Sequence, residues 1–231
     1  NWDNKTWLSS KAYINSFNLY VLKKKKLNKN SRILDIGCSR GKIFGSMSRK
    51  LKLDNKPIGV DPVPHKDIDK SINFRNEDIF KFLKNNQNKF DLIMIKQTLH
   101  FFNKDKRSKL IKICKNYLKK NGVLIILSLN TSNNEIPCFK LMKQKLNRGL
   151  KRDSKMIKLI CKILKNNKID KFIFKVSITK KKYIQMLKQK YISCLVNLNK
   201  NQISKGISEL KDIYPNKIIF DDVLICVKYK N

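Results

Sequence analysis

Short apolar runs alternate with amphipathic stretches through the first 130 residues of the chain. The runs are bounded by polar residues or glycine, which is typical of buried strands, while the stretches between them repeat their apolar positions at helical spacing. The predicted strands are 33–36, 56–61, 90–95 and 123–129, and the predicted helices follow residues 42, 78 and 109. Strands and helices that alternate in this order predict an α/β fold with a parallel sheet.

The last hundred residues follow a different pattern. Residues 139–150 and 154–164 predict two consecutive helices, where one would complete a minimal α/β unit, and residues 172–178 alternate as a strand does. Thr179 begins a helix predicted to run through Leu195, and Asn199 with Gln202 resembles a capping box. The final stretch, 217–228, is a strand or a hairpin. Which of these strands takes the sixth position of the sheet stays open.

An aromatic stripe precedes the first strand. Trp7, Tyr13, Phe17 and Tyr20 fall close to helical spacing, and Trp2 lies upstream of them. One interpretation is a helix that packs these rings against the domain. The other is a lid over a cationic ligand, because aromatic faces attract cations. The sequence favours the two equally.

The most distinctive stretch is 31–42, in which a buried strand ends in Asp35 and breaks into a turn bracketed by Gly37 and Gly41. Glycine lets the backbone approach a ligand closely, and the first N–H groups of the following helix face the same space. A second strand ends in Asp61, twenty positions after Gly41, where an acidic residue suits ribose hydroxyls. The spacing predicts a nucleotide-type cofactor bound in a crevice between Asp35 and Asp61.

The pattern Asp35-x-Gly37-x-Ser39-x-Gly41 resembles motif I of the class I S-adenosylmethionine-dependent methyltransferases. Ser39 stands where that family usually has its middle glycine. The segment 72–80, with Asp78, resembles the third motif of the family, and 96–102 resembles the segment after the fourth strand in its small-molecule "type 11/12" group. Dinucleotide-binding oxidoreductases share the strand, turn and helix, but the four ordered matches favour a methyltransferase.

This resemblance implies a doubly wound, mostly parallel seven-stranded sheet with helices on both faces and a helical cap. It implies a single domain with a helical lid at 1–30, a cofactor-binding core at 31–130, a substrate cap with one strand at 131–216 and a final strand at 217–231. The cofactor would be S-adenosyl-L-methionine, with S-adenosyl-L-homocysteine as product. The implied cofactor-binding residues are Asp35, Gly37, Cys38, Ser39, Gly41, Asp61, Pro62, Asp78, Ile79, Lys96 and Gln97.

Candidate residues on the acceptor side are fewer. His100 follows the fourth strand and has the near-neutral reference pKa of a general base, although capping the next helix is the simpler role. His65 lies in a loop after Asp61 and is expected to be solvated. The candidate substrate and lid residues are Trp2, Trp7, Tyr13, Tyr183 and Tyr191, and core packing is the simpler role for the tyrosines.

The high net positive charge of the chain is weaker evidence for nucleic-acid binding than its magnitude suggests. There are 53 basic and 17 acidic residues, a net charge of +36, yet only seven of the basic residues are arginine and only one residue is alanine. An AT-rich coding sequence produces this bias towards lysine without selection for binding. The lysines are spread along the chain, and arginine, the usual residue for bidentate phosphate and guanine contacts, is scarce.

Other features narrow the class of protein. Six scattered cysteines without a C-x-x-C pair, and only two histidines, offer little for a zinc site and are typical of a reducing compartment. No apolar run reaches eighteen residues and no leader pattern is seen, so we expect a cytoplasmic protein without a membrane span.

We therefore predict methyl transfer to a small-molecule acceptor by in-line displacement, and the positive charge of the chain favours an anionic acceptor. The alternatives are an RNA or other nucleic-acid methyltransferase and a non-catalytic cofactor-binding subunit. The residues 96–98, Lys-Gln-Thr, lack the Asp/Asn-Pro-Pro-aromatic signature of enzymes that methylate nucleic-acid amino groups, which disfavours the first alternative.

Overall fold

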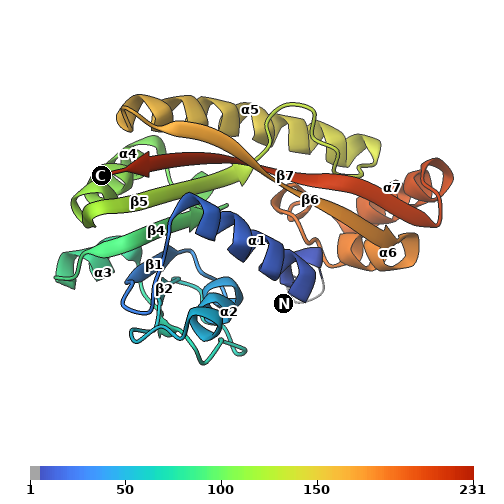
Figure 1. The fold of residues 1–231 in the computed structure, drawn as a ribbon. Helices are drawn as coiled ribbons and strands as arrows, with labels where there is room; N and C mark the ends of the chain where they lie inside the picture. The colour runs from blue at the N-terminus through green and yellow to red at the C-terminus, as the bar shows by residue number, and fades with distance from the viewer. Residues whose placement is uncertain (1–5) are drawn as a thin grey trace.

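The computed structural model describes residues 6–231 and contains one seven-stranded sheet with the order β3-β2-β1-β4-β5-β7-β6 (Figure 1). Neighbouring strands from β3 to β5 are parallel, and β7 lies antiparallel between β5 and β6. The predicted fold class, a mostly parallel seven-stranded α/β sheet, is confirmed. The strands are β1 Ile33–Ile36, β2 Ile58–Val60, β3 Asn73–Arg75, β4 Phe90–Lys96, β5 Leu118–Leu129, β6 Lys168–Thr179 and β7 Lys217–Lys230.

Helices cover both faces of this sheet and gather at one end of the antiparallel pair formed by β6 and β7 (Figure 1). Residues 6–231 also contain three short 3-10 helices, η2 Trp7–Ser9, η3 Leu99–Phe101 and η4 Ser193–Leu195. The helices are α1 Lys11–Lys24, α2 Lys42–Leu51, α3 Ile79–Asn85, α4 Lys104–Asn116, α5 Lys140–Ile163, α6 Lys180–Lys188 and α7 Lys200–Ile213. None of the helices between residues 6 and 231 is long and apolar enough to cross a membrane.

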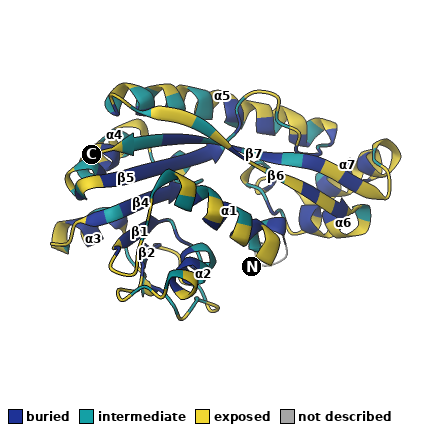
Figure 2. Cartoon of the chain, in the orientation of Figure 1, coloured by how far each residue is buried: buried dark blue, intermediate teal, exposed yellow. Residues whose placement is uncertain are grey.

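Two apolar cores form, one on each face of the sheet. In β1 the side chain of Ile33 enters the core shared with α1, α2, α6 and α7, while its neighbour Leu34 enters the core shared with α3 and α4. All four residues of β1 are buried, and Figure 2 shows the same burial in the central strands. A parallel strand covered on both faces needs apolar residues at consecutive positions, which explains the short uninterrupted apolar runs of the sequence.

The two helices predicted at 139–150 and 154–164 are one helix, α5. Leu150 belongs to the core on the α1 side, whereas Met156, six residues later, belongs to the opposite core. An interval of six residues breaks the spacing of three or four that keeps side chains on one helix face. The sequence pattern therefore changes phase where α5 changes the core it packs against, although its backbone continues.

Two other predicted helices end early. The helix predicted from Thr179 through Leu195 ends at Lys188, and Lys190 then adopts a left-handed conformation with φ 53°. The helix predicted to end at Asn121-Gly122 ends at Asn116 instead. Asn121 and Gly122 both lie within β5. There the pairing of β4 with β5 shifts register, so the turn-forming pair marks a bulge rather than a helix end.

The capping box before α7 is confirmed. The Asn199 side chain accepts the N–H of Gln202, and the Gln202 side chain accepts the N–H of Asn199. The final stretch is the strand β7, which takes the sixth position of the sheet, and β6 lies outside it at the edge.

Two helical glycines test this packing. At Gly206 in α7 an added Cβ would lie 2.4 Å from ring carbons of Phe139, whereas at Gly149 in α5 the nearest atom, Nη2 of Arg152, would be 3.7 Å away. We expect Gly206→Ala to lower the free energy of unfolding by about 1–3 kcal/mol through overpacking. Gly149→Ala is the matched control and should raise it by up to about 1 kcal/mol through helix propensity. Urea titrations measure both values, and equal effects at the two sites would contradict the packing of α7 on Phe139.

Candidate functional site

Three acidic residues lie at the carboxyl ends of three adjacent strands. Asp35 is the third residue of β1, Asp61 directly follows β2, and Asp78 follows β3 as the N-cap of α3, where its carboxylate accepts the N–H of Phe80 at 2.8 Å. Because β1, β2 and β3 are parallel neighbours, these carboxylates share one edge of the sheet. The prediction that Asp35 and Asp61 lie on the same edge is confirmed.

The turn after β1 has an unusual backbone. Gly37 and Gly41 adopt positive φ values of 75° and 67°, and Ser39 between them adopts φ 50°. The Ser39 N–H donates to Oδ2 of Asp61 at 2.9 Å, and Oδ1 of the same carboxylate accepts the N–H of Val63 at 2.9 Å. Asp61 therefore ties the turn after β1 to the turn after β2, and this hydrogen bond offsets the strain of a left-handed serine.

The segment after β4 packs closely against this turn. A Cβ on Gly37 would lie 2.1 Å from Oγ1 of Thr98, so only glycine permits the approach. Gln97 is also left-handed, with φ 52°, and Thr98 donates to the carbonyl of Lys96 at 3.0 Å. Lys96 and Gln97, predicted as cofactor contacts, thus lie at the same edge of the sheet as the glycine turn.

The other residues predicted to contact the cofactor differ in how far they are buried. Cys38 is buried, and its sulfur covers Gly59, where an added Cβ would lie 2.7 Å from Sγ. Ile79 is buried in the α3 core, so only its backbone can serve a ligand, whereas Pro62 is exposed. His65, expected to be solvated, is partly buried, with Nε2 4.0 Å from a carboxylate oxygen of Asp61.

A buried group of opposite charges lies beside Asp35. Nζ of Lys96 is 5.4 Å from the ring centre of Tyr13 and 5.6 Å from that of Phe17. Burial lowers the pKa of Lys96, while the charges of Asp222 and Asp35 favour its protonated form. Asp222 accepts the indole N–H of Trp7 at 2.8 Å, and burial raises the pKa of its carboxyl.

Asp222 is not among the site residues predicted from the sequence, although the sequence holds a signal for it. Ile218, Phe220, Leu224 and Cys226 share the buried face of β7, and Asp222 occupies the middle position of that series. An acid in a buried register of a strand needs a partner, and Lys96 and Trp7 supply it.

Asp35 is only 5% exposed. Burial raises the pKa of Asp35 to about 7, with the nearby Asp61 adding to the rise and Lys96 opposing it. Near neutral pH this carboxyl therefore exists in both protonation states. A cation placed beside Asp35 would favour the ionised carboxylate and lower its pKa.

The helix α1 covers this edge of the sheet. Tyr13 and Phe17 are completely buried, and their rings meet Phe172 of β6 at centre distances of 5.5 and 5.0 Å. Asn18 of α1 donates to the carbonyl of Ile43 in α2 at 3.2 Å. The aromatic stripe thus packs against the domain as one interpretation predicted, and it lies over Lys96. Trp2 falls outside the described residues.

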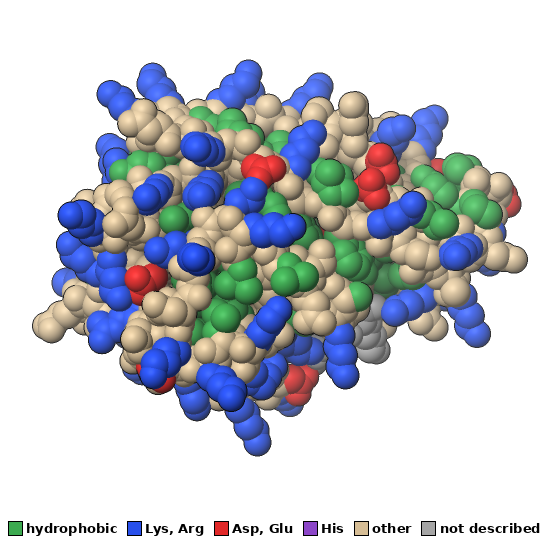
Figure 3. Space-filling model, in the orientation of Figure 1, with side chains coloured by type: hydrophobic (Ala, Val, Ile, Leu, Met, Phe, Trp, Pro, Cys, Tyr) green, Lys and Arg blue, Asp and Glu red, His purple; other side chains and the backbone are tan. Residues whose placement is uncertain are grey.

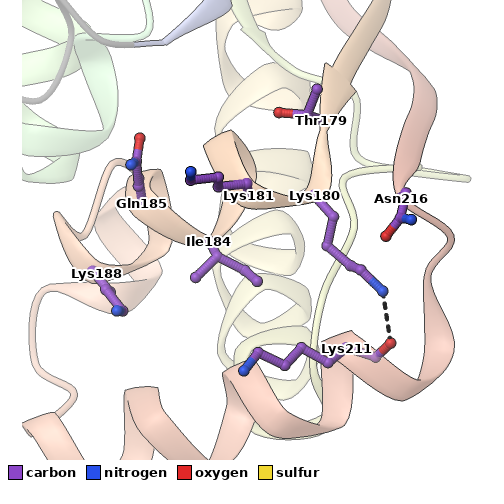
Figure 4. Close-up of a pocket in the computed structure, with 8 residues that line it drawn as sticks. All are labelled: Thr179, Lys180, Lys181, Ile184, Gln185, Lys188, Lys211 and Asn216. Carbon is purple, nitrogen blue, oxygen red and sulfur yellow. Dashed lines mark hydrogen bonds between the residues drawn. The ribbon is translucent and has the colours of Figure 1, made fainter.

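Asp35 and Asp61 are both buried, so the open crevice expected between them is not seen in the part of the chain that the structure describes. Two surface hollows instead flank α6. Figure 4 shows the one beside α7, whose lysine Lys180 donates to the carbonyl of Lys211 at 2.9 Å. The other separates α6 from the segment before α1. Neither hollow is lined by Asp35, Asp61 or Lys96.

Two buried polar atoms that the structure describes near these carboxylates lack hydrogen-bond partners. Among the described residues, the buried hydroxyl of Tyr13 and the buried Oδ1 of Asn18 have no hydrogen-bond partner. Both belong to α1, the helix that covers the carboxylate edge. Buried polar atoms without partners are rare and indicate that a further polar group belongs beside them. The donors and acceptors present fit a cationic, hydroxyl-bearing nucleoside cofactor.

Tyr183 and Tyr191 have a packing role in the structure. The Tyr183 hydroxyl donates to the carbonyl of Pro137 at 2.5 Å and lies 2.8 Å from the Tyr191 hydroxyl. The Tyr191 ring also contacts the ring of Trp7, with centres 5.5 Å apart. Contact of these tyrosines with a substrate stays a prediction.

His100 lies in η3 and belongs to a different charged group. It interacts electrostatically with Asp153 of α5 and with Arg152 and Arg107, and burial lowers its pKa. The proposed capping role of His100 is wrong, because Asn103 caps α4 by accepting the N–H of Lys106 at 2.9 Å. Asp153 is not among the predicted site residues, because it lies 53 positions from His100 on a helix whose orientation the sequence does not specify.

Comparison with known proteins identifies a related family model and several structures with a similar fold. Residues 34–126 match the type 11 family model described as "Methyltransferase domain". No curated protein matches the chain in sequence. Among solved structures, the plantazolicin methyltransferase BpumL, in complex with a desmethylPZN analog and SAH, is 17% identical with TM-score 0.56, over 100% of this chain and 88% of that one.

Two further structures share the fold at similarly low identity. A SAM dependent methyltransferase from Archaeoglobus fulgidus is 17% identical, with TM-score 0.53 and coverage of 95% of this chain and 93% of its own. Precorrin-6y C5,15-methyltransferase from Geobacter metallireducens is 12% identical, with TM-score 0.54 and coverage of 93% and 87%.

The raised pKa of Asp35 makes stability depend on pH. A carboxyl whose pKa rises from about 4 in the unfolded chain to about 7 in the fold stabilises fully below pH 4, and this contribution is lost as pH rises through 7. We expect Asp35→Asn to raise the free energy of unfolding at pH 8 by about 1–4 kcal/mol. The difference from the wild type should shrink towards pH 4.

Urea titrations across pH 4–8 measure this effect, with Asp54→Asn, an exposed acid after α2, as the control. A variant at Asp35 that is less stable than the wild type at pH 8 would contradict the burial of an ionisable carboxyl there.

Proposed function

We propose that this chain is a class I, Rossmann-like S-adenosylmethionine-dependent methyltransferase of the type 11 group and that it methylates a small-molecule acceptor by in-line displacement. The observation that carries the proposal is the row of carboxylates Asp35, Asp61 and Asp78 beside a left-handed glycine turn. That row offers acceptors for an amino group, a ribose diol and an adenine amino group in strand order.

Each residue of the edge has a proposed part. Asp61, already oriented by two backbone N–H groups, would accept the ribose hydroxyls, and Asp78 with the N–H of Ile79 would bind the adenine edge. Gly37 and Gly41 allow the backbone of the turn to approach the ligand. Asp35 would bind the amino group. When bound, S-adenosylmethionine supplies an electrophilic methyl group on a sulfonium.

The acceptor class rests on two kinds of support. Two methyltransferases that share this fold are named for the compounds plantazolicin and precorrin-6y rather than for a nucleic acid. The net charge of +36 would also concentrate an anionic acceptor around the protein. In this proposal residues 1–30 act as the lid and the elements within 131–216 form the acceptor-side cap.

Nucleic acid is a less favoured acceptor. Figure 3 shows lysine and arginine side chains spread over the visible face, with apolar side chains between them, rather than gathered into one stripe. A strand of nucleic acid is recognised by a continuous basic groove, often with aromatic platforms.

Calorimetry tests the cofactor. The protein should bind S-adenosylmethionine and S-adenosylhomocysteine with dissociation constants in the micromolar range. Tight binding of NADH without binding of either adenosyl compound would contradict the proposal. A screen of candidate metabolites for release of S-adenosylhomocysteine would then identify the acceptor, with structured RNA at physiological salt as the competing substrate.

Asp61→Ala tests the ribose contact. The variant loses an oriented acceptor and the hydrogen bond to Ser39, so its affinity for S-adenosylhomocysteine should fall at least tenfold, about 1.4 kcal/mol. Asp54→Ala should bind as the wild type does. An Asp61 variant with unchanged affinity would rule out the proposed ribose position.

His100 is the proposed general base, with Asp153 facing it. Its lowered pKa keeps it neutral, and able to accept a proton, at pH 7. Turnover should therefore decline only as pH falls through the lowered pKa of His100. His100→Gln should reduce kcat by about 10²-fold or more while leaving cofactor affinity within about threefold. Full turnover in the variant would remove His100 from the reaction.

A further inference from the structure

Lys96 places a positive charge in the site where the proposed function would bind a second one, the sulfonium of S-adenosylmethionine. Its ammonium lies over the rings of Tyr13 and Phe17, at 5.4 and 5.6 Å from their centres. Aromatic faces and carboxylates are the groups that bind ammonium and sulfonium ions in proteins. The environment that holds Lys96 is therefore also suited to the sulfonium of S-adenosylmethionine.

The groups around Lys96 come from three sides. Asp35 on β1 and Asp222 on β7 are its acidic neighbours, and Tyr13 on α1 contributes a ring and a hydroxyl. Asp61 lies beyond Asp35 and interacts with it electrostatically. Asp222 is held in place by the indole of Trp7, at 2.8 Å. When both acids are ionised they carry one more negative charge than the ammonium balances, and a second cation beside Asp35 favours that ionised state.

A second cation nevertheless meets repulsion from the first. Two like charges about 8 Å apart at an effective dielectric constant near 20 repel by an amount that changes affinity by about 10- to 30-fold. Loss of the Lys96 proton removes that repulsion. Burial already lowers the pKa of Lys96, so the proton is easier to remove than from an exposed lysine.

We propose, resting on the proposed function, that the ammonium of Lys96 stands in for the cofactor's cation within the box formed by Tyr13, Phe17, Asp35 and Asp222. Binding of S-adenosylmethionine would then expel a proton from Lys96 into solvent. S-adenosylhomocysteine, which lacks the sulfonium charge, would bind without expelling it. Lys96 would thus determine how strongly the protein distinguishes cofactor from product.

Titration calorimetry on the full chain tests this inference through binding rather than turnover. Lys96→Met should increase the affinity for S-adenosylmethionine by about tenfold or more, and change that for S-adenosylhomocysteine by less than about threefold. Lys96→Arg keeps the charge and should leave the ratio of the two affinities near that of the wild type. Lys115→Met is the matched control, because Lys115 also lies over a ring, 5.0 Å from the centre of Tyr229, but far along the chain from the carboxylates.

The wild-type protein supplies an independent measurement that needs no variant. Calorimetry in buffers of different ionisation enthalpy should show more proton release with S-adenosylmethionine than with S-adenosylhomocysteine. The ratio of the two affinities should favour S-adenosylmethionine increasingly as pH rises. Because both compounds carry the amino group, titration of Asp35 affects both and largely cancels from this ratio.

The outcomes separate the two claims. Equal proton release, together with a Lys96→Met variant that changes both affinities equally or neither, would overturn the role of Lys96 and leave the proposed function intact. A wild-type protein that binds neither compound would overturn both.

Discussion

The carboxylate of Asp61 is the contact on which the candidate site depends. It accepts the N–H of Ser39 from the turn after β1 and the N–H of Val63 from the turn after β2. The carbonyl of the same residue accepts the side-chain amide of Asn76, beyond β3, at 3.0 Å. One residue thus fixes three successive strand ends, and a left-handed serine is tolerated in a turn where glycine would be less strained.

The charges behind this contact are arranged for binding rather than for stability. Buried charged groups such as Asp35, Lys96 and Asp222 are costly to desolvate, and apolar side chains of similar size often stabilise a fold at least as well. The raised pKa of Asp35 and the lowered pKa of Lys96 both record that cost. Groups with shifted pKa values in one cluster are typical of functional sites, and the partnerless hydroxyl of Tyr13 beside them agrees with that.

Much of this site is local in sequence and could be predicted. Asp35, Gly37 and Gly41 are a strand end and a turn, and the parallel sheet brings Asp61 to the same edge without further information. The cover over that edge could not be predicted, because it depends on how α1 packs between α2 and β6. Asp222 and Asp153 come from distant segments of the chain. The continuity of α5 could not be predicted either, because its two halves pack against different cores and its apolar pattern changes phase between them.

The most direct test of the central claim is a crystal structure of the protein with S-adenosylhomocysteine bound. The account predicts the ribose hydroxyls within hydrogen-bond distance of Asp61 and the amino group beside Asp35, with α1 over the ligand. A ligand seated in the hollows beside α6, or a ribose that contacts neither carboxylate, would contradict it.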